Sequence, residues 1–430
     1  MLYQLSYAPK RRNISMWLRR HKRFWRVPTL RTAVVYGASG IGFAGANLVL
    51  ARVLAKSEYA LFTLVLAFVN FGFALATAGI DGIALRRELD FGPRLLGKVA
   101  GAATIVATVL GGIAWAGYDL APPLVGMLAA SVAAGGVMVV AGARFQREQR
   151  FGLSLALVQS PNLFLVLAAG AVLATHAERA WVPVLISTIG FVAGAVAGWW
   201  LLFRERRATG AGSVFSWREA LAFAGLNASG LLLVQLDRLM IPHLLPLDDL
   251  ATYGVLAALV GSPFRVLQNS VGYTLLPRLT AATSISERRR LVKREVWLAG
   301  LLVLAASSAV WVIVPWVEHW LLAGKYDLGV ALVLAAIVAG LAKVLNAFSR
   351  ATVTALADQR EVALTNVLGW ASVAVAAAAA VAGARWGLAG VIYGVGLGWF
   401  LRAFAALWLS ARHLRAPANV TTDTAPMAPE

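Results

Sequence analysis

The sequence predicts an all-α polytopic membrane protein with twelve transmembrane helices, arranged as a parallel repeat of two halves. Its composition is the first reason: 60% of the 430 residues are hydrophobic, only 14% are charged, and the mean hydropathy is +0.73. A soluble core cannot absorb so much apolar sequence, because such cores stop growing beyond about 250–300 residues. The second reason is that apolar runs of about 20 residues recur, each long enough to cross ~30 Å of hydrocarbon as a helix. The third reason is an internal repeat.

The composition also narrows the function. The chain has no cysteine, which excludes disulfides, thiol catalysis and cysteine-ligated metal sites, and we expect neither a metal nor a cofactor. The formal net charge of +19 could indicate nucleic-acid binding. The charges, however, lie in short loops between apolar runs rather than on one soluble face, so no nucleic-acid partner is expected.

Taken in order, the chain begins with a basic segment, residues 1–30, in which aromatic residues are interleaved. No signal-peptide core follows directly, so we expect an uncleaved cytoplasmic arm that lies on anionic lipid. A cytoplasmic linker, 204–217, joins an N-terminal lobe, 31–203, to a C-terminal lobe, 218–410. Residues 411–430 form a cytoplasmic tail rich in Pro, Thr and Ala, which we expect to be disordered. The twelve predicted spans are 31–51, 60–83, 97–118, 123–143, 153–174, 181–203, 218–244, 250–276, 295–317, 327–349, 362–383 and 387–410.

The distribution of basic residues predicts the orientation. Of the 39 Lys and Arg residues, five lie in the predicted outer loops and four lie inside spans, which leaves 30 for the even-numbered connections and the terminal segments. Because positive charge collects on the cytoplasmic side of membrane proteins, both termini are predicted to be cytoplasmic. The outer residues are Arg52, Lys56, Arg179, Lys325 and Arg385, and those inside spans are Arg238, Arg265, Lys343 and Arg402.

The chain repeats itself at an offset of 191 residues, which places residues 53–62 on residues 244–253. In both copies an acidic turn joins two spans, and an aromatic residue follows at the same position. The last span of each half carries a ridge of glycines, which lets helices approach closely in lipid. Six spans per half keep both copies in one orientation, so we expect a transporter-like site between the halves. The ridges are Gly190, Gly194 and Gly198 in the first half and Gly390, Gly394 and Gly398 in the second.

Short motifs near the start of each half resemble those of a known family. In the first half they are NLVLARVL at 47–54, EYALF at 58–62 and GIDG at 79–82, ahead of Arg86 and Arg87. In the second half they are Asp237-Arg238, YGV at 253–255 and Leu276-Pro277. These motifs resemble Wzx-type oligosaccharide/polysaccharide flippases of the multidrug/oligosaccharidyl-lipid/polysaccharide (MOP) exporter superfamily. The resemblance extends over nearly all of 31–410, and twelve spans rather than fourteen argue against the lipid II flippase branch.

The resemblance implies two six-helix lobes around a central cavity that opens alternately to each side. It implies a flippase rather than an enzyme, which moves undecaprenyl-pyrophosphate-linked oligosaccharide from the cytoplasmic to the outer leaflet of the bacterial inner membrane. The product would serve O-antigen, capsule or exopolysaccharide synthesis, with a polysaccharide polymerase and chain-length proteins as partners besides membrane lipids. The expected substrate-binding residues are Arg238, Arg265, Arg52, Asn47, Gln235, Gln268 and Asn269.

Arg265 is the leading candidate because it lies far from both ends of its span, beyond easy snorkelling. A charge at mid-membrane costs at least roughly 2.5–3.5 kcal/mol, so such a residue needs a role. Arg265 either binds the pyrophosphate, which suits its rigid fork, or forms a structural ion pair with a carboxylate such as Asp237. Asp237 and Arg238 are adjacent and point about 100° apart on a helix, so one faces the cavity and the other a neighbouring helix.

Asp237, Asp81 and Lys343 are the candidates for coupling or gating. Asp237 either carries a coupling ion or proton or pairs structurally. Asp81 lies near the cytoplasmic surface, where it forms either a gate salt bridge or a helix-end charge. Lys343 either takes part in gating or snorkels to that surface, and Arg52 is either a contact at the cavity mouth or a snorkelling anchor.

Two motifs bear on alternative functions. Residues 40–45 match G-x-G-x-x-G, but they lie in an apolar span with no strand before them, so helix packing explains the glycines better than dinucleotide binding. No Walker motif is present in the sequence, so energy has to come from an ion gradient, the membrane potential or the cargo gradient.

Two rival functions remain. One is a cation-coupled multidrug antiporter of the same superfamily, whose cationic cargo an arginine-lined cavity would repel. The other is a membrane glycosyltransferase, polymerase or ligase, which would need catalytic carboxylates or histidines and commonly a sizeable outer loop.

Overall fold

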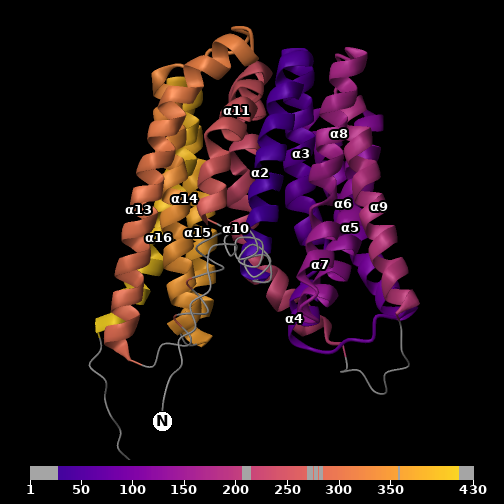
Figure 1. Ribbon diagram of the computed structural model, residues 1–430, viewed down its shortest axis with the longest axis vertical. Coiled ribbons are helices and arrows are strands. Elements are labelled where there is room, and N and C mark those ends of the chain that lie inside the picture. The colour runs from indigo at the N-terminus through magenta and orange to yellow at the C-terminus, as the bar shows by residue number, and fades with distance from the viewer. Residues whose placement is uncertain are drawn as a thin grey trace, which may run out of the picture.

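The computed structural model describes residues 28–205, 215–268, 275, 279, 284–356 and 359–415, which form a bundle of long helices (Figure 1). None of these residues belongs to a β-strand. Nearly all of the predicted N-terminal arm, the centre of the linker and the last part of the tail lie outside the described residues.

Helical structure covers every predicted span of the first half. Two spans are interrupted: 60–83 breaks between α3 and α4, and 153–174 breaks at Gln159 with a bend of 43°. The helices are α2 (Pro28–Val53), α3 (Lys56–Ala76), α4 (Ile80–Arg86), α5 (Pro93–Tyr118), α6 (Pro122–Arg147), α7 (Phe151–Val158), α8 (Ser160–Thr175) and α9 (Trp181–Arg204).

The second half also consists of long helices. Its second span bends by 50° between α11 and the helical segment Gly261–Gln268. The helices are α10 (Trp217–Leu244), α11 (Leu247–Leu259), α13 (Ile285–Trp316), the π-helical turn η1 (Val317–Leu321), α14 (Val330–Leu356), α15 (Gln359–Gly383), the 3-10 turn η2 (Ala384–Trp386) and α16 (Gly387–Arg415).

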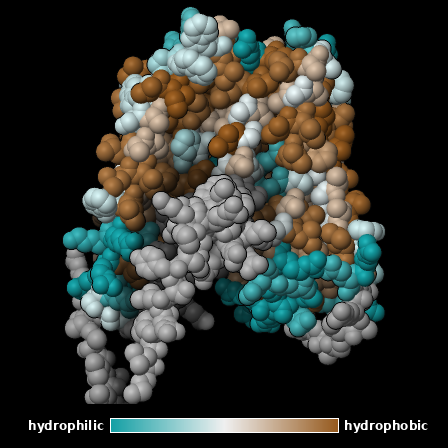
Figure 2. Space-filling model, viewed as in Figure 1, coloured by the Kyte–Doolittle hydropathy of each residue, from teal (hydrophilic) through white to brown (hydrophobic). Residues whose placement is uncertain are grey.

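Seven of these helical stretches are long and apolar enough to cross a membrane, and up to ten are if each bent pair counts as one span. The chain is therefore a multi-pass membrane protein, although its predicted total of twelve spans exceeds this number. Large apolar side chains such as Ile105, Val312 and Phe404 are exposed on the outside of the bundle. Figure 2 shows a broad hydrophobic band on the surface, with hydrophilic residues concentrated at the lower end.

The internal offset reappears in the helix ends. α2 ends at Val53 and α3 begins at Lys56, while α10 ends at Leu244 and α11 begins at Leu247, so both boundaries differ by 191 residues. These four helices lie between α5–α9 on one side of Figure 1 and α13–α16 on the other. α3 packs against both α10 and α11, and α2 packs against α11.

The glycine ridges pack as predicted. A Cβ at Gly190 would lie 2.6 Å from the Cβ of Phe164 in α8, and one at Gly198 would lie 2.9 Å from Ala141 in α6. In the second half, a Cβ at Gly394 would meet the backbone of Ala379 in α15 at 2.5 Å. Any larger residue would therefore force these helices apart.

Gly79, between α3 and α4, is required for two reasons. Its φ of +78° lies in the left-handed region that favours glycine. In addition, a Cβ there would lie 1.9 Å from the carbonyl oxygen of Ala220 in α10. The first turns of α10 reach across to α4 at this point, where Arg87 also pairs with Glu219 at 3.2 Å.

Candidate functional site

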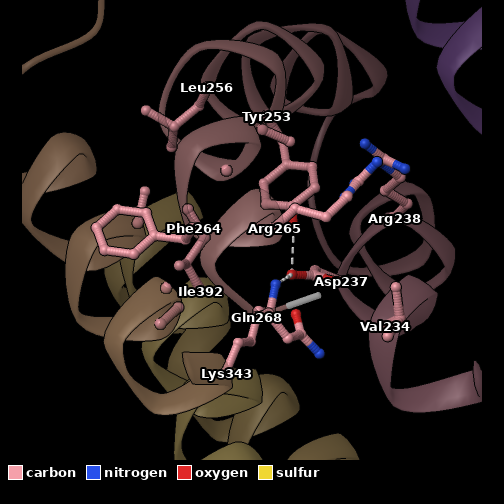
Figure 3. A pocket seen from close by; sticks show the side chains of 15 residues that line it. Val234, Asp237, Arg238, Tyr253, Leu256, Phe264, Arg265, Gln268, Lys343 and Ile392 are labelled. Carbon is pink, nitrogen blue, oxygen red and sulfur yellow. Dashed lines mark hydrogen bonds and ion pairs between the residues drawn. The ribbon is translucent and has the colours of Figure 1, made fainter. Parts of the chain in front are cut away.

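A small polar pocket lies inside the second half of the molecule (Figure 3). Its volume is about 60 Å³, which holds only a few water molecules, since one water occupies roughly 10–15 Å³ by this measure. The charged side chains come from three elements: Asp237 and Arg238 from α10, Arg265 from the segment after α11, and Lys343 from α14. The other lining residues are Val234, Tyr253, Leu256, Ala257, Gly261, Phe264, Gln268, Ala336, Ala339, Gly340 and Ile392.

Asp237 is the centre of this pocket and is 1% exposed. Its Oδ2 accepts a short hydrogen bond from the hydroxyl of Tyr253 and lies 3.9 Å from Nζ of Lys343 (Figure 3). Its Oδ1 is buried and has no hydrogen-bond partner among the described residues. The carboxylate is therefore partly compensated, by one ammonium group and one hydroxyl.

Lys343 lies in the pocket rather than at the cytoplasmic surface. Its ammonium group also lies 5.9 Å from the ring centroid of Trp399. Of the two interpretations open from the sequence, snorkelling does not describe this conformation, because the ion pair with Asp237 turns the side chain inward.

Arg238 and Arg265 have no such counter-charge. Arg238 is 5% exposed, donates from Nη1 to Oε1 of Gln235 at 3.0 Å, and leaves its buried Nε without a partner in the described part of the chain. Arg265 stacks 5.4 Å from the ring centroid of Phe43 in α2 and forms no ion pair with a described carboxylate. Its residue is exposed, and it also lines the pocket.

The remaining predicted site residues are dispersed. Asn47 is buried and donates to the carbonyl of Phe43 in its own helix, 2.8 Å away. Arg52 is exposed at the far end of α2, and Gln268 lines the pocket. Asn269 lies outside the described residues. Asp81 starts α4, but in the described structure the neighbouring Arg87 pairs with Glu219 instead.

The pocket belongs to one half only, whereas the repeat led us to expect a site between the halves. At the offset of 191, Asp237, Arg238 and Arg265 correspond to Ala46, Asn47 and Ala74. At these three positions the charges are therefore found in the second copy of the repeat and not in the first.

Tyr253 is the functional side chain that sequence reasoning missed. The same offset aligns it with Phe62, so the hydroxyl group is what distinguishes the second copy. The signal that could have identified it is a tyrosine 16 residues after the intramembrane Asp237, in the next predicted span.

The two halves also contact each other at the C-terminal end of α2. Lys325, which precedes α14, donates to the carbonyls of Ala51, at 3.0 Å, and of Leu54. The hydroxyl of Tyr326 donates to the same Ala51 carbonyl at 3.1 Å, and Lys56 lies 5.5 Å from the Tyr326 ring centroid. Burial and the nearby charge of Lys56 lower the pKa of Lys325, so its ammonium group has exchanged water for the end carbonyls of α2.

Comparison with known proteins identifies the fold. No family model and no curated protein sequence matches the chain. Among solved structures, an inward-facing multidrug resistance MATE family transporter of the MOP superfamily superposes with a TM-score of 0.60 at 11% identity, over 89% of this chain and 98% of that one. An outward-facing structure of such a transporter gives 0.53 at 12% identity, over 90% and 95%.

The lipid II flippase MurJ, in an inward closed conformation, also superposes with a TM-score of 0.60, at 9% identity over 87% of this chain and 86% of that one. At such low identities these likenesses establish the fold and not the activity. The chain thus has the helical transporter fold that is common to MATE transporters and MurJ.

Proposed function

We propose that this protein is a flippase for an undecaprenyl-pyrophosphate-linked oligosaccharide, and that Arg238 and Arg265 bind the pyrophosphate. The observation that carries the proposal is the charge balance of the pocket. Three cations, Arg238, Arg265 and Lys343, surround the single carboxylate of Asp237. Because Lys343 and Tyr253 already interact with that carboxylate, two arginines remain for an anionic cargo.

Membrane energetics support an anionic ligand. Each uncompensated charge near the bilayer centre costs at least roughly 2.5–3.5 kcal/mol, so a ligand that supplies negative charge is favoured strongly. An arginine pair can hold a pyrophosphate bidentately, which a point charge cannot. The exposed Arg265 would meet the cargo first.

The pocket volume of about 60 Å³ is far too small for an oligosaccharide. We therefore propose alternating access, in which the two halves separate so that the sugar occupies the space between them and only the phosphates reach the arginines. The likeness to both MATE transporters and MurJ supports a fold capable of such movement.

We further propose that the chain has twelve spans in two six-helix lobes with both termini in the cytoplasm of a bacterium, and that the membrane is the inner one. The stretch Ala363–Leu409 contains two antiparallel helices, α15 and α16, and α2 is a further helix of 26 residues. The seven single stretches become eight when Ala363–Leu409 is divided into α15 and α16; the three bent pairs and α2 bring the total to twelve, which supports the proposal. Reporter fusions at Lys56, Asp249 and Lys325 should report outside, and fusions at Gly210 and Arg289 inside; the inverse pattern would exclude this topology.

A multidrug antiporter is the alternative that the fold permits. Its usual cargo is cationic, and a pocket with three cations and one carboxylate would repel it. Asp237 could still couple a proton, but the carboxylate is occupied by Lys343 in this conformation.

The experiment that separates these functions uses the purified protein in proteoliposomes. One set carries a fluorescent undecaprenyl-pyrophosphate-linked oligosaccharide, whose movement between leaflets is read by chemical quenching from outside. A second set is loaded with a cationic dye to measure efflux. We expect flipping without dye transport; dye efflux without flipping would replace the flippase by the antiporter.

A further inference from the structure

A second buried basic group lies in the second half, outside the pocket. Arg402 of α16 is 8% exposed, and its Nη1 is buried without a hydrogen-bond partner among the described residues. Among the described residues, Arg350 interacts electrostatically with Arg402, and its charge is also positive. No described carboxylate pairs with Arg402. A buried arginine in a membrane helix normally pairs with an acid or lines a hydrated path, so a negative partner is missing here.

Two glycines make room for the guanidinium group. A Cβ at Gly230 of α10 would lie 3.2 Å from Nη2 of Arg402, and a Cβ at Gly369 of α15 would lie 3.4 Å from Nη1. These two positions put the guanidinium group at the meeting point of α10, α15 and α16. Larger residues at either glycine would compete with it for space.

A second unpartnered donor faces the same point. The hydroxyl oxygen of Ser229, in α10, lies 2.9 Å from the Cβ position of Gly369. Ser229 is 0% exposed and its Oγ has no hydrogen-bond partner among the described residues. Oγ of Ser229 and Nη1 of Arg402 are therefore separated by at most the sum of 2.9 and 3.4 Å, or 6.3 Å.

One bridging atom spans this separation, because each donor can reach it at roughly 3 Å. A water molecule would satisfy the hydrogen bonds but would leave the charge of Arg402 uncompensated in a low-dielectric interior, where an unpaired ion costs several kcal/mol. A single-atom anion satisfies both requirements. A phosphate ester of the cargo has no route to it, since both side chains are nearly closed to solvent.

We propose that Arg402 and Ser229 hold a small inorganic anion of halide size between α10, α15 and α16. This site is separate from the arginines of the pocket and does not depend on the identity of the cargo. The bound anion would hold α10 against α15 and α16, so it would stabilise the second half as a unit.

The test is the chloride dependence of thermal unfolding of the full chain in detergent, followed by tryptophan fluorescence. Chloride is exchanged for gluconate at constant ionic strength. We expect each tenfold rise in chloride above its dissociation constant to raise the unfolding midpoint by about 1–3 °C, and bromide to act likewise. Arg402→Leu should remove this response, whereas Arg385→Leu, a control arginine in the outer loop, should keep it.

Steric variants probe the same site without changing charge. Gly369→Ala should weaken the chloride response at least tenfold in concentration, because its methyl group fills the space between the two donors. Gly300→Ala is the matched control, since nothing lies within 4 Å of the added Cβ. If Arg402→Leu does not fold, Ser229→Ala serves instead and should also weaken the response.

A bromide complex should show an anomalous peak beside Arg402 and Ser229. The proposal is overturned if chloride and gluconate give the same midpoint, if Arg402→Leu keeps the full response, or if the position holds only water. Stabilisation through Arg402 by inorganic pyrophosphate, but not by chloride, would also overturn it and assign the residue to the cargo.

Discussion

Arg265 is the residue whose substitution most directly tests the pyrophosphate site. It is exposed and forms no ion pair with a described carboxylate, so we expect Arg265→Ala to leave no buried acid unpaired. We expect flipping per inserted molecule to fall at least tenfold with unchanged protein levels. Arg265→Lys should restore part of it, because an ammonium group keeps the charge but loses the fork.

The matched control is Arg179→Ala, another arginine of the chain, which lies in the loop between α8 and α9. Its flipping should equal that of the original protein. Flipping at the original rate by a well-inserted Arg265→Ala variant would remove Arg265 from the site. A loss of inserted protein would instead indicate a structural role.

In contrast to Arg265, Asp237 and Lys343 should contribute to stability as a structural pair. Asp237→Asn leaves Lys343 among two arginines without its counter-charge, so we expect lower stability. Asp237→Asn combined with Lys343→Gln should recover part of the loss. A double-mutant cycle on unfolding should give a coupling energy of about 0.5–3 kcal/mol, and strict additivity would argue against the pair.

At the residue scale, the sequence predicted which charged residues have a role but not how they pair. Intramembrane charge is costly, so Asp237, Arg238 and Arg265 could be identified from sequence as residues with a role. Which cation pairs with Asp237 depends on how α14 packs on α10, and sequence position does not encode that contact. The sequence left a structural pair of Arg265 with Asp237 open as an alternative to pyrophosphate binding, whereas the ion pair that the described structure contains is that of Asp237 with Lys343.

At the scale of elements, hydropathy located the helices but not their breaks. In the described part of the chain, the predicted spans coincide with helical structure, because apolar length favours a helix that can cross the membrane. The bends at Gln159 and Val260 carry no charge, so a hydropathy profile does not detect them; the local signals that mark them are Pro161 and Pro263, which follow within three residues. Arg265 follows the second of these bends and lines the pocket.

The contact of Lys325 and Tyr326 with the end of α2 should act as a latch between the halves. Lys325→Gln removes the charged donor to the carbonyls of Ala51 and Leu54, which should favour separation at that end. Since the chain has no cysteine, Thr63→Cys can report this. Thr63 is 2% exposed and contacts Gly254 of α11, at the interface between the halves.

We expect labelling of that cysteine by a membrane-impermeant maleimide to rise several-fold in the Lys325→Gln background. Arg179→Gln, which removes a charge from the loop between α8 and α9, should leave labelling unchanged. Equal labelling in both backgrounds would mean that the contact does not hold the halves together.

At the scale of the whole molecule, the described structure reproduces the predicted 191-residue offset in its helix ends, whereas the predicted function stays a proposal. The offset of 191 recurs in the ends of α2, α3, α10 and α11, because a repeated hairpin has to turn at the same place to pack the same way. The charges do not follow the repeat, since binding needs them once. The repeat therefore predicted where these helices end. It also predicted a site between the halves, whereas the residues that line the described pocket belong to the second half.

The last prediction tests whether transport needs the halves to separate. α3 and α11 touch where a Cβ on Gly254 would lie 2.7 Å from Oγ1 of Thr63, close enough for a disulfide after Thr63→Cys and Gly254→Cys. No other cysteine competes, because the chain has none. We expect oxidation to stop flipping in proteoliposomes and reduction to restore it. Thr63→Ala with Gly254→Cys, which has one thiol, should be indifferent to redox state. If the cross-linked protein flips at the full rate, α3 and α11 move together, and cargo must pass through the second half alone.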